Sequence, residues 1–287
     1  MNRRQFLGAG AAGFVSLTRF PHHLFAAGTK KNANDRVVLG PRKIQLSRLA
    51  LGTGTHGGGG SSNQTRQLGT SGLADLFRAA FDQGITFWDT ADQYGSHPHL
   101  KEALKSVPRE KVAIITKCNS KTADAVKSDV DRYRRELGVD YIDAVLLHAV
   151  TPGDWNVRLR GPMDVLEEAR AKGVIRSHGI SAHALPALKT AATEPWTEIV
   201  FSRLNPAGLH MDGSPAEVAA ALSDIKKAGK GVVGMKILGQ GDLRGKVDEA
   251  LQFATAQDCL DAMTIGAESR AEMEDLLKKI PAASVRG

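Results

Sequence analysis

Short apolar runs alternate along the chain with segments whose apolar residues recur at helical spacing. This alternation is typical of βα units and a parallel sheet rather than of an antiparallel meander. Several segments end at glycine or begin at proline, as at Gly84, Gly138 and Pro215. Strands are predicted near 48–53, 85–89, 112–117, 142–148, 177–181, 198–203, 231–236 and 262–265. Helices are predicted near 71–83, 98–106, 122–137, 162–172, 184–192, 215–228, 246–256 and 269–279.

Eight strand–helix pairs in about 240 residues predict the α/β fold of a single (β/α)8 TIM barrel. Residues 36–46 alternate around Gly40-Pro41-Arg42, which is a turn signal, so we expect an N-terminal β-hairpin before the barrel. The predicted organisation is a signal segment at 1–27, a polar linker at 28–36 and the barrel at 37–287.

The first residues have the character of an export signal. Arg3-Arg4 precedes Phe6-Leu7 and a weakly apolar, Gly/Ala-rich stretch that is too short to span a bilayer. This pattern resembles a twin-arginine signal. It predicts the twin-arginine export machinery as a partner and a periplasmic location for the mature protein, either free or still tethered.

Charge and cysteine content exclude some functions. The net charge is +7, and removing Arg3, Arg4 and Arg19 leaves +4 on the rest of the chain. This excess is small, and no basic stripe is interleaved with aromatic residues, so we expect no nucleic-acid partner. Neither cysteine, Cys118 or Cys259, has metal-ligand spacing around it, which argues against a cysteine-based metal site.

The segment Gly52-Thr-Gly54-Thr-His-Gly57 fits the glycine pattern of a dinucleotide-binding Rossmann turn. However, a Gly/Ser-rich polar stretch follows it instead of a helix, and no acidic strand end lies about 20 residues further on. We therefore interpret this segment as a flexible first βα loop.

Four chemically active side chains lie at or just beyond the ends of three consecutive predicted strands: Asp89 and Tyr94, Lys117, and His148. In a barrel these strand ends converge on one rim. Tyr94 is the natural proton donor to a carbonyl oxygen. A lysine at about 4 Å contributes up to roughly 4 kcal/mol at an effective dielectric of 20 and favours the phenolate. Asp89 would orient Lys117, and a neutral His148 would align the substrate oxygen.

This set resembles the Asp-Tyr-Lys-His tetrad of the aldo-keto reductases. The resemblance continues in Asp89-Thr-Ala-Asp-Gln-Tyr94-Gly95, Lys172-Gly173-Val-Ile-Arg176 and Thr264-Ile-Gly266-Ala267. It implies hydride transfer between a nicotinamide cofactor and a small carbonyl or alcohol. It places the cofactor along the barrel mouth, against Gly54, Ser181, Asn205, Lys236, Gly239, Gly241, Gly266, Glu268, Ser269 and Arg270.

Three positions depart from the family pattern. Ala182 stands where an asparagine holds the carboxamide, Phe201 where a glutamine is expected, and Leu204 where an aromatic residue often stacks on nicotinamide. Glu268 favours NAD, because a carboxylate repels a 2′-phosphate, whereas Arg270 favours NADP. We expect NADP as the cofactor, with NAD as the alternative.

Two other functions remain open from the sequence. His56, Asp89, His178 and His183 raise the possibility of a metal-dependent barrel hydrolase or isomerase. His178 and His183 are five apart, so they point to opposite faces unless the strand ends before His183, and no metal site is expected. The altered nicotinamide contacts also allow a non-catalytic nicotinamide-binding sensor. The physiological substrate and the oligomeric state are open.

Overall fold

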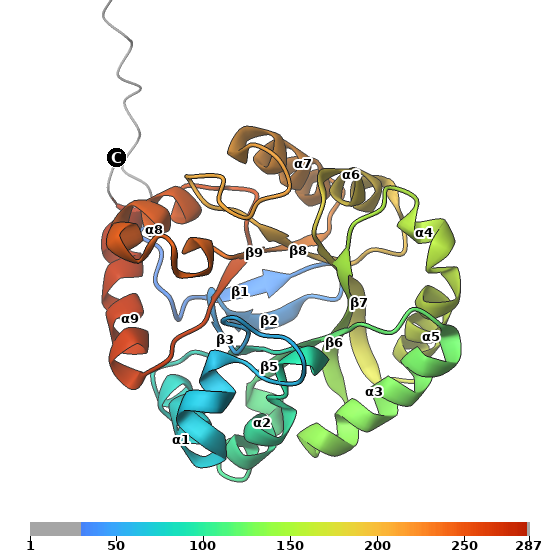
Figure 1. Ribbon diagram of the computed structural model, residues 1–287, viewed down its shortest axis with the longest axis horizontal. Helices are drawn as coiled ribbons and strands as arrows, with labels where there is room; N and C mark the ends of the chain where they lie inside the picture. Colours follow the sequence, from blue (N-terminus) through green and yellow to red (C-terminus); the bar gives the residue numbers. More distant parts are fainter. Residues whose placement is uncertain (1–29, 286–287) are drawn as a thin grey trace, which may run out of the picture.

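The computed structural model describes residues 30–285, so the signal segment predicted at 1–27 lies outside the described residues. Eight parallel strands close into a barrel in the order β10-β3-β4-β5-β6-β7-β8-β9 (Figure 1). This confirms the predicted (β/α)8 fold. The barrel strands are β3 (Leu49–Gly52), β4 (Phe87–Asp89), β5 (Ala113–Cys118), β6 (Ile142–Val150), β7 (Ile175–Ala182), β8 (Ile199–Arg203), β9 (Gly231–Met235) and β10 (Ala262–Ile265).

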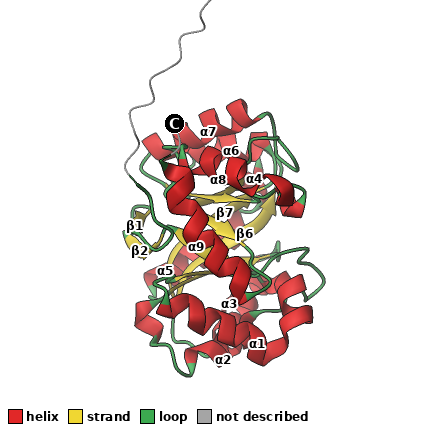
Figure 2. Ribbon diagram, turned by 90° about the vertical axis from the view of Figure 1, so that its left-hand side faces the viewer, coloured by secondary structure: helices red, strands yellow, loops and turns green. Residues whose placement is uncertain are grey.

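Helices surround the barrel as an outer layer (Figures 1 and 2). The main ones are α1 (Asn63–Asp82), α2 (His97–Leu104), α3 (Ala123–Leu137), α5 (Arg160–Ala171), α6 (Leu185–Thr193), α7 (Pro215–Lys227), α8 (Val247–Thr255) and α9 (Arg270–Ser284). The short elements are the helix α4 (Trp155–Arg158) and the 3-10 turns η1 (Asp92–Tyr94), η2 (Arg109–Lys111), η3 (Gly239–Gly241) and η4 (Arg244–Lys246). Ten residues separate β3 from α1, as the interpretation of the first loop required.

The hairpin formed by β1 (Arg36–Leu39) and β2 (Ile44–Ser47) covers the N-terminal end of the barrel (Figure 2). Leu39 and Leu46 are fully buried and belong to the core inside the barrel. At the turn, Gly40 has φ of +65°, and a Cβ there would lie 3.0 Å from the carbonyl oxygen of Glu198. Glycine therefore allows the hairpin to seal this end, which leaves the opposite end for chemistry.

Strand β4 shows how the alternation of side chains positions the site. Phe87 points into the barrel and meets Phe201 edge to face at 6.2 Å between ring centres. Trp88 points outward and packs on Phe77 of α1 at 4.7 Å. Because successive side chains of a strand alternate between its faces, Asp89 points inward again at the C-terminal end of β4.

Part of the polar segment predicted as a linker at 28–36 packs against the barrel. The Lys31 amide donates to Ser284 Oγ at 2.9 Å, and its ammonium donates to the Thr255 carbonyl oxygen at 2.6 Å. Ala33 is buried. Within residues 30–285, no helix has both the length and the apolar character needed to cross a bilayer.

Candidate active site

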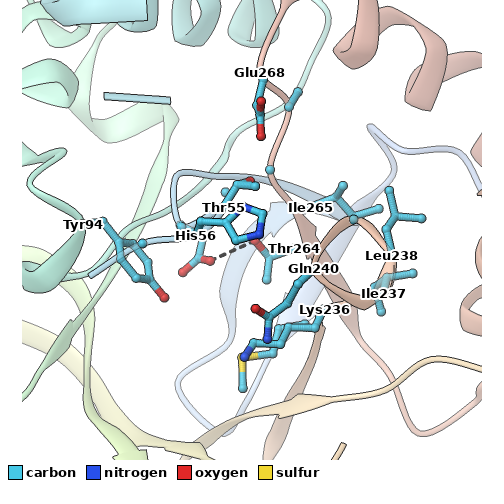
Figure 3. A pocket seen from close by; sticks show the side chains of 18 of the residues that line it. Thr55, His56, Tyr94, Lys236, Ile237, Leu238, Gln240, Thr264, Ile265 and Glu268 are labelled. Atoms are coloured by element: carbon cyan, nitrogen blue, oxygen red, sulfur yellow. Dashed lines mark hydrogen bonds between the residues drawn. The ribbon is translucent and has the colours of Figure 1, made fainter. Parts of the chain in front are cut away.

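A cavity of about 480 Å³ opens at the C-terminal ends of the strands, the end where parallel barrels carry their active sites. Its wall is built from the loops after β3, β4, β9 and β10 and from the first turns of α9 (Figure 3). All four residues of the predicted catalytic set line it: Asp89, Tyr94, Lys117 and His148.

Asp89 and Lys117 form an ion pair inside the barrel mouth, with exposed side-chain fractions of 7% and 1%. The ammonium also donates to the Thr90 carbonyl oxygen at 2.9 Å. The second carboxylate oxygen of Asp89 accepts from Thr264 Oγ1 at 2.9 Å. Both buried charges therefore have partners, as buried charges require.

Tyr94 lies at the end of η1, and the first βα loop packs against its ring. A Cβ on Gly54 would lie 2.6 Å from the Tyr94 ring, and one on Gly57 would lie 2.5 Å from it. These two glycines of the Rossmann-like pattern therefore make room for a tyrosine. On the other side, Arg132 of α3 donates to both carboxylate oxygens of Asp92, at 2.8 and 3.0 Å.

The protonation of Tyr94 differs from the sequence prediction. Burial and the nearby Asp89 carboxylate raise the pKa of the phenol above its ordinary value. The Lys117 ammonium lies 5.3 Å from the centre of the Tyr94 ring, and its charge is engaged by Asp89. The expected shift toward phenolate is therefore wrong, because burial and the Asp89 charge raise the pKa of the phenol.

His148 is held as a neutral imidazole. Burial, followed by the charge of Lys117, lowers its pKa to about 2. Its ring meets the Tyr94 ring edge to face at 5.8 Å, and His183 lies on its other side at 6.0 Å. His148 Nδ1 is buried without a hydrogen-bond partner. A neutral imidazole beside the phenol is able to donate a hydrogen bond to a substrate oxygen, as predicted.

Half of the predicted cofactor-binding residues line this cavity: Gly54, Lys236, Gly241, Gly266 and Glu268. Lys236 has φ of +54°, a backbone conformation that is uncommon outside glycine and is often found at functional sites. Burial and the nearby Arg203 lower the pKa of Lys236 to about 8. Its ammonium has no ion-pair partner among residues 30–285, so it is available to an anionic ligand.

The other half do not line it. Ser181 is buried beneath the wall, 3.5 Å from His183 Nε2 and 3.9 Å from Met235 Sδ. The Asn205 side chain bonds the backbone of Leu209. The remaining three residues are placed away from the cavity: Gly239 packs on Leu209 and Leu243, and Ser269 and Arg270 line a separate small cavity of about 150 Å³.

Sequence reasoning missed several residues of the wall. Thr264 is among them, although its segment was quoted, because its bond to Asp89 joins positions 175 apart in sequence. The other missed polar residues are Thr55, Gln93, Gln240, Arg244, Glu272 and Asp275. Only Gln93 carried a usable signal, since it adjoins Tyr94 in the loop after β4.

The residues considered as metal ligands do not all face the same cavity. His178 faces outward from the barrel, where it stacks on Trp196 at 4.3 Å and bonds Glu167 at 2.8 Å. His183 lines the cavity, so the two histidines face opposite sides, as their spacing indicated. In the part of the chain that the structure describes, no three His, Cys, Asp or Glu side chains are grouped to hold a metal.

The positions that depart from the family pattern are apolar and buried. Ala182 and Leu204 pack in the layer between strands and helices, and Phe201 lies inside the barrel. The centre of the Phe201 ring is 5.1 Å from the Lys117 ammonium. Phe201 thus contacts the Lys117 ammonium from the barrel interior instead of offering an amide to a ligand.

A sequence model of the Aldo/keto reductase family matches residues 48–282, which include the whole barrel. The chain belongs to this family. The reductase fold is also found in solved structures. A putative aldo-keto reductase from Pseudomonas aeruginosa aligns with a TM-score of 0.74 and 21% identity, over 89% of this chain and 98% of that one. An aldo-keto reductase from Bacillus halodurans in its holo form aligns with a TM-score of 0.69 and 19% identity, over 86% and 90%.

Curated relatives match over shorter stretches of this reductase-family chain. The NADH-specific methylglyoxal reductase of Escherichia coli is 30% identical over 169 residues, which are 50% of this chain and 51% of the relative. The 2,5-diketo-D-gluconic acid reductase B of a Corynebacterium is 32% identical over 136 residues, 44% and 46% of the two chains. The chain thus spans about half the length of the curated relatives it matches.

Proposed function

We propose that this protein is a nicotinamide-dependent oxidoreductase that reduces a small aldehyde or ketone, or oxidises the matching alcohol. The observation that carries the proposal is the meeting of a protonated Tyr94, the buried Asp89–Lys117 pair and a neutral His148 at one side of a single cavity. A proton donor and an oxygen-aligning donor side by side are what reduction of a carbonyl requires.

In the proposed reaction, the carbonyl oxygen binds between the Tyr94 hydroxyl and His148. A bound nicotinamide cofactor supplies the hydride. Tyr94 donates its proton to the oxygen as negative charge develops there. The raised pKa keeps the phenol protonated before the reaction, and the Lys117 charge stabilises the phenolate that remains. His148, which is uncharged, aligns the oxygen without competing for the proton.

The cavity fits a dinucleotide. Its volume of about 480 Å³ lies within the range of ligand sites. Lys236 supplies a cation that forms no ion pair with the described residues, and the backbone at Gly241 and Gly266 allows close approach of a diphosphate. Part of the contact set expected around the nicotinamide is absent, since Ser181 lies beneath the wall and Ala182 packs outside the barrel.

We also propose export of the folded protein to the periplasm by the twin-arginine route, on the basis of the sequence of residues 1–27. Because free nicotinamide nucleotides are not expected in that compartment, the cofactor would be loaded before export and held tightly. Purification of the exported form, denaturation and assay of the released nucleotide test this idea. Rapid and complete exchange of bound nucleotide on dilution would contradict it.

The decisive experiment compares Tyr94→Phe with Tyr141→Phe in a reductase assay. The substrates are small aldehydes, including methylglyoxal, which the name of the Escherichia coli relative suggests. Tyr141 is a matched control, because it lies between Arg109 and Arg176 on the outside of the barrel. We expect Tyr94→Phe to lose at least about 100-fold in kcat, within the range for general acid catalysis, while nucleotide still binds.

Equal turnover by the two variants would overturn the assignment of Tyr94. Nucleotide binding by the wild-type protein with no turnover on any carbonyl would instead favour the alternative of a non-catalytic nicotinamide-binding sensor. The apolar residues at Ala182 and Leu204, where the family holds or stacks the nicotinamide, are the observation that keeps this second candidate open.

A further inference from the structure

The side of the cavity formed by the β10–α9 connection and η4 is acidic. Glu268, Glu272 and Asp275 all line it there, and Arg244 is the basic residue of the wall beside them. Figure 3 shows Glu268 well apart from Tyr94, across the cavity. Three carboxylates facing one guanidinium make this region unfavourable for an additional phosphate group.

The N-terminus of α9 is occupied by its own side chains. The Glu272 carboxylate accepts from the Glu268 amide at 2.8 Å, and Ser269 Oγ accepts from the Glu272 amide at 3.1 Å. A helix N-terminus attracts anions through its free amides and its dipole. In this protein the Glu268 amide just before the helix and the Glu272 amide in its first turn already have side-chain acceptors, so a phosphate bound at Glu268 would have to displace the Glu272 carboxylate.

Glu268 itself is held in position. Its Oε1 accepts from Asn63 Nδ2 at 2.9 Å and lies 3.9 Å from Arg244 Nη2. The side chain is only 16% exposed, whereas that of Arg244 is 70% exposed. The more buried group at this position is therefore the carboxylate, and the guanidinium is its more exposed partner.

Arg270, the residue that favoured NADP in the sequence, points away. Its Nε donates to Glu274 at 2.8 Å along the helix surface, and its side chain is 67% exposed. It lines the separate small cavity and not the active-site cavity. The main sequence argument for recognition of a 2′-phosphate is therefore lost.

We infer that Glu268 selects NAD(H) over NADP(H). This inference rests on the proposed function: a dinucleotide whose reactive ring lay beside Tyr94 would bring its adenosine ribose to the part of the cavity where Glu268 lies. A carboxylate there accepts hydrogen bonds from ribose hydroxyls and repels a 2′-phosphate, a common basis of discrimination between the two cofactors. The inference thus differs from the sequence expectation of NADP.

The test measures dissociation constants by nucleotide fluorescence, without turnover. NADH and NADPH are titrated into the wild type, Glu268→Gln and the control Glu274→Gln. Glu274 lies on the same helix and pairs with Arg270 outside the cavity. We expect the wild type to bind NADH at least about tenfold more tightly than NADPH, since one repulsive contact of about 1.4 kcal/mol is worth a factor of ten. Glu268→Gln should narrow this ratio mainly by tightening NADPH, and Glu274→Gln should leave it unchanged.

Fragments test the same region directly. AMP and adenosine 2′,5′-bisphosphate are used to displace bound NADH, and AMP is expected to compete better in the wild type but not in Glu268→Gln. Tighter binding of NADPH by the wild type, or an unchanged ratio in Glu268→Gln, overturns the selectivity and leaves the proposed function intact. Failure of both nucleotides to bind overturns the proposed function, and the selectivity with it.

Discussion

Lys117 directs its ammonium to the Asp89 carboxylate and holds it there inside the barrel mouth, while the ring of Tyr94 lies 5.3 Å away. The pair joins β4 to β5, and the bond from Thr264 adds β10. These groups are almost completely enclosed. The pair therefore has two consequences: it sets the electrostatic field around the phenol, and it makes the fold depend on both charges.

Removal of either charge should destabilise the protein strongly. Asp89→Asn or Lys117→Met leaves an uncompensated buried charge, and we expect each to lower the free energy of unfolding by about 3–5 kcal/mol. The double variant should lose much less stability than the sum of the two single losses, because no charge remains unpaired. Urea unfolding monitored by circular dichroism measures all three.

The exposed pair of Glu168 on α5 and Lys172, the C-cap of that helix, serves as the control for that cycle. Single substitutions there should lower the free energy of unfolding by less than about 1 kcal/mol. If the losses from Asp89→Asn and Lys117→Met simply add in the double variant, the two residues are not energetically coupled and the ion pair is incidental to stability.

Arg132 should position Tyr94 without touching the substrate. It donates two hydrogen bonds to Asp92, at the start of the same 3-10 turn as Tyr94. It also forms ion pairs with Asp129 and Glu136 of its own helix. We expect Arg132→Gln to reduce kcat by roughly 10–100-fold, because a displacement of about 1 Å is costly in catalysis. The dissociation constant for nucleotide should change little.

Arg134 on the same helix pairs with Asp131 at 3.8 Å and donates to the Asp140 carbonyl oxygen at 2.8 Å instead of to the turn, so Arg134→Gln is the control. Arg132→Lys should recover little of the rate, since an ammonium does not reproduce the bidentate hydrogen bonding of a guanidinium. Full recovery by lysine would mean that only the charge matters and that the turn is not positioned by this contact.

The sequence predicted the barrel and the meeting of the four candidate catalytic residues because both depend on short-range patterns. Apolar runs fix the strands, and parallel strands bring their C-terminal ends to one rim whatever the details of register. Asp89, Lys117 and His148 at or near strand ends were therefore bound to be neighbours. The bond between Thr264 and Asp89 was beyond such reasoning, because it depends on how the last strand closes against the first.

The remaining site residues could not be predicted because the sequence does not show the direction in which each side chain points. Glu268 precedes α9 and Arg270 begins it, and the sequence treats them as one cluster. Ser269 between them is the N-cap and has extended backbone, with φ of −155° and ψ of 163°, so the two side chains are not related by helical spacing. The structure accordingly places Glu268 in the cavity wall and Arg270 on the surface. The protonation of Tyr94 was mispredicted for a related reason, since distance to a cation is visible from a motif whereas burial is not.

Buried neutral histidine should make the fold sensitive to acid. Burial lowers the pKa of His148 to about 2, whereas an unfolded histidine titrates near 6.5. Below pH 6.5 the unfolded state takes up the proton first, so the free energy of unfolding falls as the pH decreases. At pH 5 the contribution is about 2 kcal/mol. His148→Gln should lose correspondingly less stability between pH 7 and 5 than the wild type, and the exposed His210→Gln should follow the wild type.

Nucleotide affinity should depend on pH through Lys236. Burial, followed by the charge of Arg203, lowers the pKa of this lysine to about 8. Below pH 8 the ammonium is charged and attracts a diphosphate, and above pH 8 the attraction is lost as the proton leaves. We expect the dissociation constant for NADH to rise by up to about tenfold between pH 7 and 9.

Lys236→Met should bind NADH more weakly at pH 7 and show a flat pH profile. Lys227→Met, an exposed change on α7, should keep the wild-type profile. Parallel pH profiles for the wild type and Lys236→Met would place the diphosphate elsewhere in the cavity, because the titrating group would then lie outside its reach.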